Sequence, residues 1–222
     1  MNFLKKLFGE EQEMTQAGVE ENFPKAKKYF EQAMSAEDND LAIKLFQKAI
    51  DLNPLYATAY VGMAMAYYTK GNFEKASAEI KREYFTKSLE AAQKASNIPS
   101  RRMEDYHLKA SLLIQANAFF LGDFETSLIA FENAINLDRH SQDAIKMLVN
   151  VWTRIKNAAN HLIESREKEY KVAFPETTLT LKQVIDLLAK LKETEDVNVY
   201  VLRPEIEGLL VKLVELQSNS RF

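Results

Sequence analysis

The chain has 222 residues, of which 46% are hydrophobic and 27% are charged, and this balance is typical of a globular protein. Six Gly and five Pro are few for this length, which argues against an all-β fold and favours helices with short connections. The absence of Cys excludes disulfides, cysteine-ligated metals and a thiol nucleophile, and the formal charge of −3 provides no basic surface for nucleic acid.

The first nine residues have the pattern of a short amphipathic helix flanked by lysines. A helix there gathers four apolar side chains on one side: Phe3, Leu4, Leu7 and Phe8. This segment is a candidate for weak contact with a membrane surface, and the alternatives are a frayed terminus or an apolar plug on the protein's own surface. Residues 10–21 carry five Glu and no basic residue, so we expect residues 1–22 to form an amphipathic segment and an acidic linker.

No membrane span or secretory signal is predicted. The longest uncharged run, residues 52–69, is interrupted by Asn53 and Pro54 and draws its apolar content mostly from Ala, Tyr and Met. Residues 1–9 lack the apolar stretch and small-residue cleavage site of an export signal. We therefore expect a cytoplasmic protein, with peripheral membrane attachment through the N-terminal segment as the alternative.

The sequence repeats itself. Residues 66–73, Ala-Tyr-Tyr-Thr-Lys-Gly-Asn-Phe, match residues 118–124, Ala-Phe-Phe-Leu-Gly-Asp-Phe, once one residue is dropped before the Gly. Residues 42–50 and 127–135 share the pattern Ala/Ser-x₃-Phe-x₂-Ala-Ile. Fixed spacing of this kind predicts a repeat architecture built from helical pairs.

The repeats resemble the tetratricopeptide repeat family, whose unit of 34 residues consists of two antiparallel helices. Ala42 and Ala76 are 34 residues apart, and the second unit matches the family pattern best. Its matching residues are Tyr60, Met63, Ala64, Tyr67, Gly71, Phe73 and Ala76. The resemblance covers about three units over residues 24–140 and implies an all-α solenoid of helical hairpins.

Packing roles follow from this pattern. Small residues are expected to let helices approach closely: Ala42, Ala64 and Ala76. Aromatic side chains are expected to fill the space between helical pairs: Phe46, Phe73 and Phe131. Asn72 and Asp123, each directly after a predicted turn glycine (Gly71 and Gly122), are predicted to cap the helices that follow.

Two insertions interrupt the period between the second and third units. They lengthen a helix predicted over residues 73–95 and the start of the helix after Ser100. Both insertions are close to whole helical turns, so they predict an elongated helical hairpin with residues 96–102 at its tip. This hairpin is either a docking prong or a packing surface for the C-terminal part.

Past residue 140 the repeat pattern ends. We expect one long helix from Asp143 that ends before Pro175, a capping box at Thr180 and Gln183 that opens the next helix, and a last helix from Pro204. Three alternating valines predict a strand: Val197, Val199 and Val201. The C-terminal helices are expected to cap the solenoid or to dimerise, which gives three parts: residues 1–22, 23–141 and 142–222.

No catalytic, metal or cofactor site is predicted, because the three histidines (His107, His140 and His161) are scattered. The resemblance implies a non-catalytic adaptor that holds a protein or peptide in a concave groove. The residues expected to line this groove are Val61, Met65, Tyr68, Leu113, Asn117 and Phe120. Family members that clamp acidic peptide tails use Lys, Asn and Arg, whereas Val61 and Met65 stand at matching places here. A hydrophobic helix or strand therefore fits better.

Two alternatives to partner binding remain open at this stage. The chain's own helix from Pro204 could fill the apolar groove. The protein could also be a self-assembling or membrane-peripheral structural subunit that uses its N-terminal amphipathic segment, as a homo-oligomer or at a membrane surface.

Overall fold

The computed structural model describes residues 16–99, 105–172 and 177–219. Its contacts divide the chain into two compact units, residues 1–102 (unit one) and residues 103–222 (unit two). The expectation of an all-α fold is confirmed, since helices make up most of both units. The apolar residues of the N-terminal amphipathic segment (Phe3, Leu4, Leu7 and Phe8) lie outside the described residues. The division of the chain at residues 22 and 141 stays a prediction.

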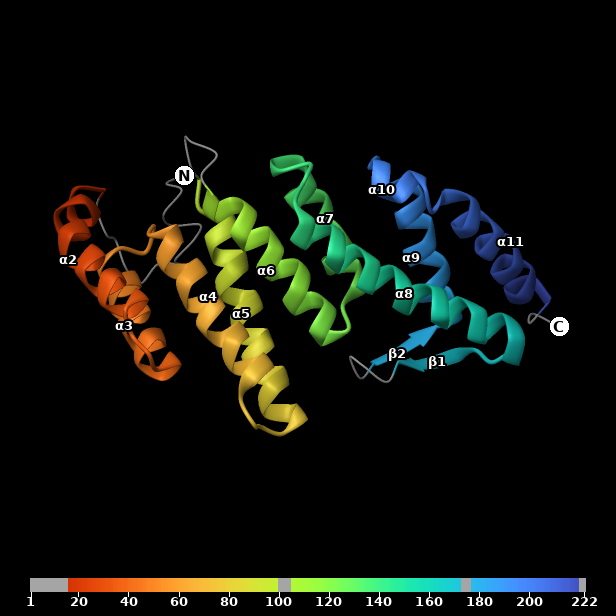
Figure 1. The fold of residues 1–222 in the computed structure, drawn as a ribbon, viewed down its shortest axis with the longest axis horizontal. Coiled ribbons are helices and arrows are strands. Elements are labelled where there is room, and N and C mark those ends of the chain that lie inside the picture. The colour runs from red at the N-terminus through yellow and green to blue at the C-terminus, as the bar shows by residue number, and fades with distance from the viewer. Residues whose placement is uncertain (1–15, 100–104, 173–176, 220–222) are drawn as a thin grey trace. The chain divides into compact units, whose positions relative to one another are not determined.

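Unit one is built from two helical hairpins (Figure 1). Its described helices are α2 (Gln16–Met34), α3 (Asn39–Leu52), α4 (Ala57–Phe73) and α5 (Ala78–Asn97), and each packs against the next. The Asp38 carboxylate accepts the Leu41 N–H at 2.8 Å and caps α3, and the Ser77 hydroxyl accepts the Ile80 N–H at 3.3 Å and caps α5. Short loops that end in these caps join α2 to α3 and α4 to α5 in antiparallel hairpins.

Small residues allow the close packing of unit one. Ala49 and Ala64 are fully buried, and Gly62 lies directly against the ring of Phe46. A Cβ atom at Gly62 would be 2.5 Å from two carbons of that ring, closer than van der Waals contact permits. The expected roles of Ala64 and Phe46 are therefore confirmed, and α3 and α4 approach each other through a glycine.

The predicted turn at residues 71–76 is wrong. Gly71 lies within α4, where a Cβ atom would be 2.6 Å from the ring of Phe85, and Asn72 is also helical and caps nothing. Phe73 is 81% exposed and Ala76 lies in the loop before α5, so neither fills the space between helices. Phe85 does so instead, because the cap at Ser77 starts α5 five residues later than predicted.

Unit two contains a helical hairpin, α6 (Asp105–Leu121) and α7 (Phe124–Leu137), followed by a C-terminal extension. The elements of the extension are α8 (Gln142–Ser165), β1 (Glu169–Val172), β2 (Thr177–Thr180), α9 (Leu181–Glu193), α10 (Val197–Tyr200) and α11 (Arg203–Asn219). Gly122 adopts φ +79°, and the Asp123 carboxylate accepts the Thr126 N–H at 3.0 Å. The predicted turn glycine and N-cap between α6 and α7 are thus confirmed.

The elongated hairpin joining α5 to α6 stays a prediction, because part of its tip, residues 100–104, lies outside the described residues. Its first helix spans Ala78–Asn97, whereas residues 73–95 were expected.

Two predictions about the C-terminal part are wrong. The long helix α8 ends at Ser165, where Arg166 adopts a left-handed φ of 59°, and an antiparallel β1–β2 hairpin follows. This hairpin forms because Val172 and Leu179, each 3% exposed, bury their side chains in the core of unit two. Residues 197–200 form the short helix α10 and no strand, because the Asp196 carboxylate accepts the Asn198 N–H at 2.8 Å.

The capping box at the start of α9 is confirmed. The Thr180 hydroxyl accepts the Gln183 N–H at 3.2 Å, and the Gln183 side-chain oxygen accepts the Thr180 N–H at 2.9 Å. These two bonds fix the point at which β2 turns into α9.

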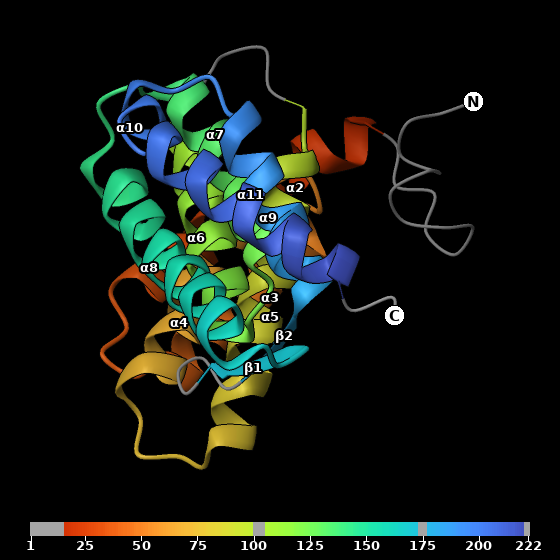
Figure 2. The same cartoon turned by 90° about the vertical axis from the view of Figure 1, so that its right-hand side faces the viewer.

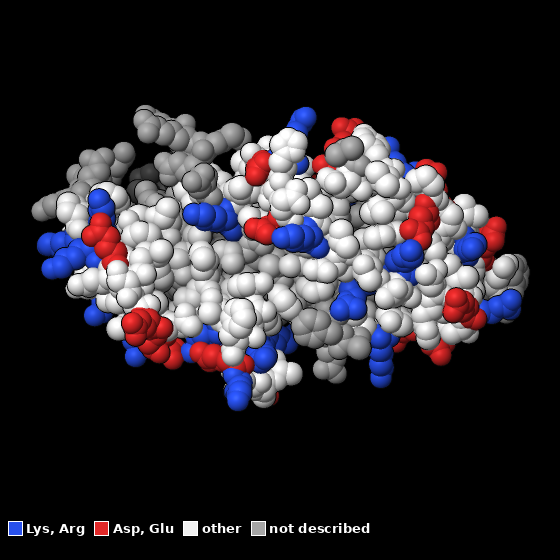
Figure 3. Space-filling model, in the orientation of Figure 1, with Lys and Arg blue, Asp and Glu red and all other residues white. Residues whose placement is uncertain are grey.

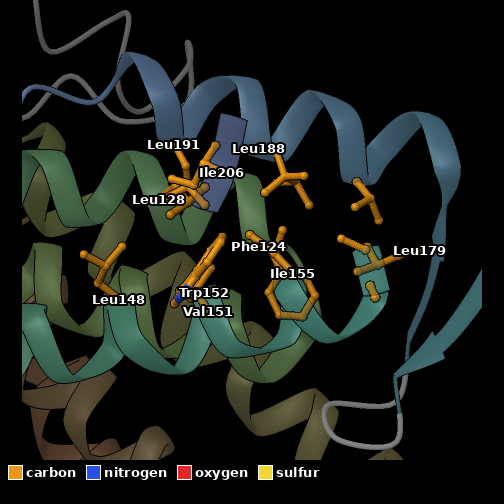
Figure 4. Close-up of a cluster of buried hydrophobic side chains, with 14 of the residues drawn as sticks. Phe124, Leu128, Leu148, Val151, Trp152, Ile155, Leu179, Leu188, Leu191 and Ile206 are labelled. Carbon is orange, nitrogen blue, oxygen red and sulfur yellow. The ribbon is translucent and has the colours of Figure 1, made fainter. Parts of the chain in front are cut away.

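The core of unit two lies between α7, α8, α9 and α11 (Figure 4). α11 packs against α8 and α9 (Figure 2) and buries three apolar side chains there: Ile206, Leu209 and Leu213. Burial of each stabilises the fold by about 1.5–3 kcal/mol. The apolar face of α11 is therefore used within unit two. No helix in the described ranges is long and apolar enough to cross a membrane.

Candidate partner-binding surface

One side of α4 faces solvent, although most of this helix is buried. Ten of its residues are buried, including the central run from Tyr60 to Ala64. The exposed or half-buried side in its C-terminal half follows helical spacing. It consists of Met65, Tyr68, Thr69, Asn72 and Phe73, which we call the α4 stripe.

The α4 stripe is uncharged and exposes two large apolar side chains. Met65 is 51% exposed and Phe73 is 81% exposed. In the view of Figure 3 the surface over the middle of α4 is mostly uncharged, and charged side chains gather at its lower end, where the loop to α5 begins. Large exposed apolar groups that follow one helix face are typical of a surface that another molecule covers.

The polar groups of the stripe are directed back onto the helix. The Thr69 hydroxyl donates to the Met65 carbonyl at 2.9 Å, and the Asn72 amide donates to the Tyr68 carbonyl at 3.0 Å. Burial raises the pKa of the Tyr68 phenol, and this effect outweighs a hydrogen bond to Asn72 that lowers it. Tyr68 therefore stays neutral at physiological pH, and the stripe carries no charge.

A buried lysine holds α4 in place. Lys70 is 5% exposed, and its Nζ lies 2.8 Å from the Asp40 carboxylate, 3.0 Å from the Glu74 carboxylate and 4.9 Å from the centre of the Tyr84 ring. Burial lowers the pKa of Lys70, but hydrogen bonds to Asp40, Glu74 and Tyr84 raise it more, so its pKa lies above the ordinary lysine value. These contacts join α4 to α3 and α5, so the stripe is carried by a fixed helix.

We expect Lys70→Met to lower the free energy of unfolding by about 1 kcal/mol, because it removes charged hydrogen bonds whose carboxylate partners are partly solvated. Urea denaturation followed by circular dichroism measures this. Lys27→Met is the control, since Lys27 and Glu31 form an exposed pair at 3.8 Å, and its effect should stay below about 0.5 kcal/mol. Equal effects of the two substitutions would contradict a stabilising role for Lys70.

The Lys70 contribution also predicts a pH dependence. Because the pKa of Lys70 is raised in the folded protein, the stabilisation is complete below the pKa of an unfolded lysine, about 10.4, and is lost as the pH rises through the folded pKa. The difference in stability between wild type and Lys70→Met should therefore shrink in strong alkali.

The structure places the sequence-predicted groove residues in two groups. Met65 and Tyr68 lie together on the α4 stripe, whereas Val61, on the same helix, is 4% exposed and packs inside unit one. The other three lie on α6 in unit two: Leu113, Asn117 and Phe120. Leu113 and Phe120 are half-buried, and Asn117 is fully buried.

The Asn117 amide donates to the Leu113 carbonyl at 2.7 Å, and Phe120 packs at the edge of the unit-two core. That all six residues line one groove stays a prediction.

Sequence reasoning missed three members of the stripe. Thr69 and Phe73 follow Met65 at intervals of four residues, and Asn72 follows Tyr68 at the same interval, so helical spacing alone was sufficient to find them. Asn72 and Phe73 were missed because the helix was expected to end before Gly71, whereas Thr69 lay within the expected helix and was overlooked.

Among the described residues, no group of three His, Asp or Glu side chains is placed to hold a metal ion. Residues 33–82 match the family model for the tetratricopeptide repeat, and this range includes α3, the whole of α4 and the first turn of α5. The match therefore contains the entire α4 stripe. No curated protein shows significant similarity to the chain.

Proposed function

Because the chain is a tetratricopeptide repeat protein, and such repeats generally mediate protein–protein interactions, we propose that it is a non-catalytic adaptor whose α4 stripe binds a partner protein. The observation that carries this proposal is the exposure of Met65 and Phe73 on a helix that is otherwise buried and held by Lys70. Proteins of this family are typically non-catalytic, which agrees with the proposal.

The chemistry of the stripe favours an apolar partner surface. Covering Met65 and Phe73 removes apolar area from water, and full burial of side chains of this size is worth about 1.5–3 kcal/mol each. Met is flexible and adapts to irregular surfaces. From Met65 to Phe73 the stripe rises about 12 Å along the helix axis, about two turns. We infer that the partner contributes an amphipathic helix whose apolar residues recur every three or four positions.

The proposal predicts that Met65→Glu combined with Phe73→Glu abolishes partner binding and leaves the fold intact, because both side chains are exposed. Leu41→Glu is the matched control, since Leu41 is 50% exposed on α3 and lies outside the stripe. Binding is measured by affinity capture from native lysate with wild type, the double variant and Leu41→Glu, and the captured proteins are identified by mass spectrometry. Circular dichroism verifies that each variant is folded.

The proposal predicts that wild type and Leu41→Glu capture the same partner protein and that the double variant does not capture it. Size-exclusion chromatography with light scattering distinguishes a second copy of the chain from another protein. Capture of the same proteins by all three forms would show that the stripe is not the binding surface.

A further inference from the structure

Unit two contains a cleft of about 560 Å³ between the start of α7, strand β2 and one face of α9. We call it the α7–α9 cleft. Its apolar lining comes from three largely buried side chains: Phe124, Leu179 and Leu187. Ala189, half-buried, adds a small side chain to the same lining. The cleft thus has apolar walls that belong to the rigid core of the unit.

The charged residues that line the cleft are mainly acidic. They are Asp123, Glu125, Asp186, Glu193 and Lys190, so four carboxylates face one ammonium group. Among the described residues that line the cleft, Lys190 is the only cation, and its Nζ lies 3.4 Å from the Glu125 carboxylate. The Asp123 carboxylate caps α7 by accepting the Thr126 N–H. These contacts occupy two of the four carboxylates.

Asp186 and Glu193 are the remaining carboxylates. Both are exposed on α9, and neither forms an ion pair within the part of the chain that the structure describes. They are seven residues apart, which is two helical turns and about 10 Å along the axis. This distance is too long for both to hold one metal ion. It equals about three residues of a chain in the extended polyproline II conformation, in which every third side chain points the same way.

The arrangement fits a positively charged, partly apolar ligand. A cleft of about 560 Å³ holds about one turn of an α-helix, which is about 10–12 Å across with its side chains, whereas a thinner chain in the polyproline II conformation can extend along it. Lysine and arginine can lay their aliphatic stems on apolar walls while their charged ends reach a rim of carboxylates. An anionic ligand is disfavoured, because Asp123 already occupies the N-terminus of α7 and the lining carries a net negative charge.

We propose that the α7–α9 cleft binds an extended segment of a partner protein in which apolar side chains lie between two lysine or arginine residues. The apolar side chains lie against the wall at Phe124, Leu187 and Ala189, and the two cations pair with Asp186 and Glu193. This site lies in unit two, whereas the α4 stripe lies in unit one, so it is a second docking site. The cleft prefers a positively charged ligand, whereas the α4 stripe prefers an apolar one.

The probe is a fluorescein-labelled peptide, Ser-Lys-Leu-Leu-Lys-Ser, titrated with the full-length protein at 150 mM salt and followed by fluorescence anisotropy. Two control peptides replace both Lys by Glu or both Leu by Ser. We expect the probe to bind at least tenfold more tightly than either control, because each control lacks one of the two features that the cleft recognises. Equal affinities for the three peptides would overturn the proposal.

Two variants place the binding in the cleft. Asp186→Asn combined with Glu193→Gln should weaken binding at least tenfold, whereas Glu164→Gln combined with Glu169→Gln makes the same charge change at exposed residues outside the cleft and should have no effect. If both double variants weakened peptide binding equally, the peptide would be attracted only by the net charge of the protein, and the proposed site would be refuted.

Ala189→Trp tests the apolar part without changing charge. The larger side chain should fill the cleft and weaken binding as much as the acidic double variant does. If this variant fails to fold, as judged by circular dichroism, the two charge variants decide alone. Met65→Glu with Phe73→Glu should leave peptide affinity unchanged, which separates failure of this site from failure of the α4 stripe.

Discussion

Leu188→Ala is expected to lower the free energy of unfolding of unit two by about 3 kcal/mol. Leu188 is fully buried on α9 and points toward α8 in Figure 4. Removing most of a buried leucine side chain loses its transfer free energy and leaves a cavity, and such substitutions cost about 2–5 kcal/mol. The surrounding side chains come from α7, α8 and α11, so the site has little freedom to collapse.

The measurement uses the single tryptophan of the chain. Trp152 lies on α8 in the same core and is 7% exposed, so its fluorescence reports the unfolding of unit two. Urea denaturation followed by this signal gives the midpoint for wild type and variant. Val211→Ala is the control, because Val211 is 59% exposed on α11 and its truncation should change stability by less than about 0.5 kcal/mol. Similar midpoints for the two variants would mean that Leu188 is not in the core.

The features of the fold that the sequence predicted correctly depend on local interactions. The turn at Gly122, the cap at Asp123 and the capping box at Thr180 each involve residues within a few positions of one another. Their sequence patterns correspond directly to backbone hydrogen bonds and to one left-handed φ value. Local chemistry of this kind is visible in a single sequence.

The errors occurred where distant contacts decide between local alternatives. Residues 71–73 have the Gly-Asn-aromatic pattern of a turn, but packing of Phe85 against Gly71 and the ion pairs of Lys70 keep α4 helical through this point. Phe85 and Ser88 repeat the three-residue spacing of Phe46 and Ala49, so the correct register was present in the sequence as a second option. Only tertiary packing selects between the two.

The β1–β2 hairpin was missed for a related reason. Helix α8 ends at Arg166 in the left-handed conformation, which glycine usually supplies, so no stop signal is visible in the sequence. The two strands have four residues each and are stabilised by burial of Val172 and Leu179 against the core of unit two. Short strands of this kind are set by their neighbours more than by their own composition.

The candidate binding surfaces show the same distinction. The family pattern placed Met65 and Tyr68 on the α4 stripe, because that pattern fixes which face of the helix is buried. Phe73 was assigned to the wrong helix as a consequence of the register error. The α7–α9 cleft could not be predicted, since it requires β2 and α9 to lie beside the start of α7.

Gly62→Val is expected to destabilise unit one by about 3 kcal/mol, although valine has the higher intrinsic helix propensity. The new Cβ would lie 2.5 Å from ring carbons of Phe46, which is 3% exposed and enclosed between helices. Overpacking of a filled core typically costs about 1–3 kcal/mol, and valine adds two methyl groups beyond the Cβ that already clashes. Steric conflict therefore outweighs propensity at this position.

The matched control is Gly208→Val. Gly208 lies exposed on α11, and apart from its chain neighbours and the local backbone of its own helix, no atom of the described residues lies within 4 Å of the position that a Cβ would take there. Only propensity acts at this residue, so stability should stay within about 0.5 kcal/mol of wild type. Urea denaturation followed by circular dichroism measures both variants, with Trp152 fluorescence recorded in parallel to identify changes in unit two.

A double variant tests the mechanism of this destabilisation. Phe46→Leu removes the ring that the new side chain meets, so adding it to Gly62→Val should make the protein more stable than Gly62→Val alone. Strictly additive losses would show that Gly62 and Phe46 do not conflict, and the close approach of α3 and α4 would then be wrong. Because α4 carries the stripe of Met65 and Phe73, the same glycine that allows this approach also determines where the proposed binding surface lies.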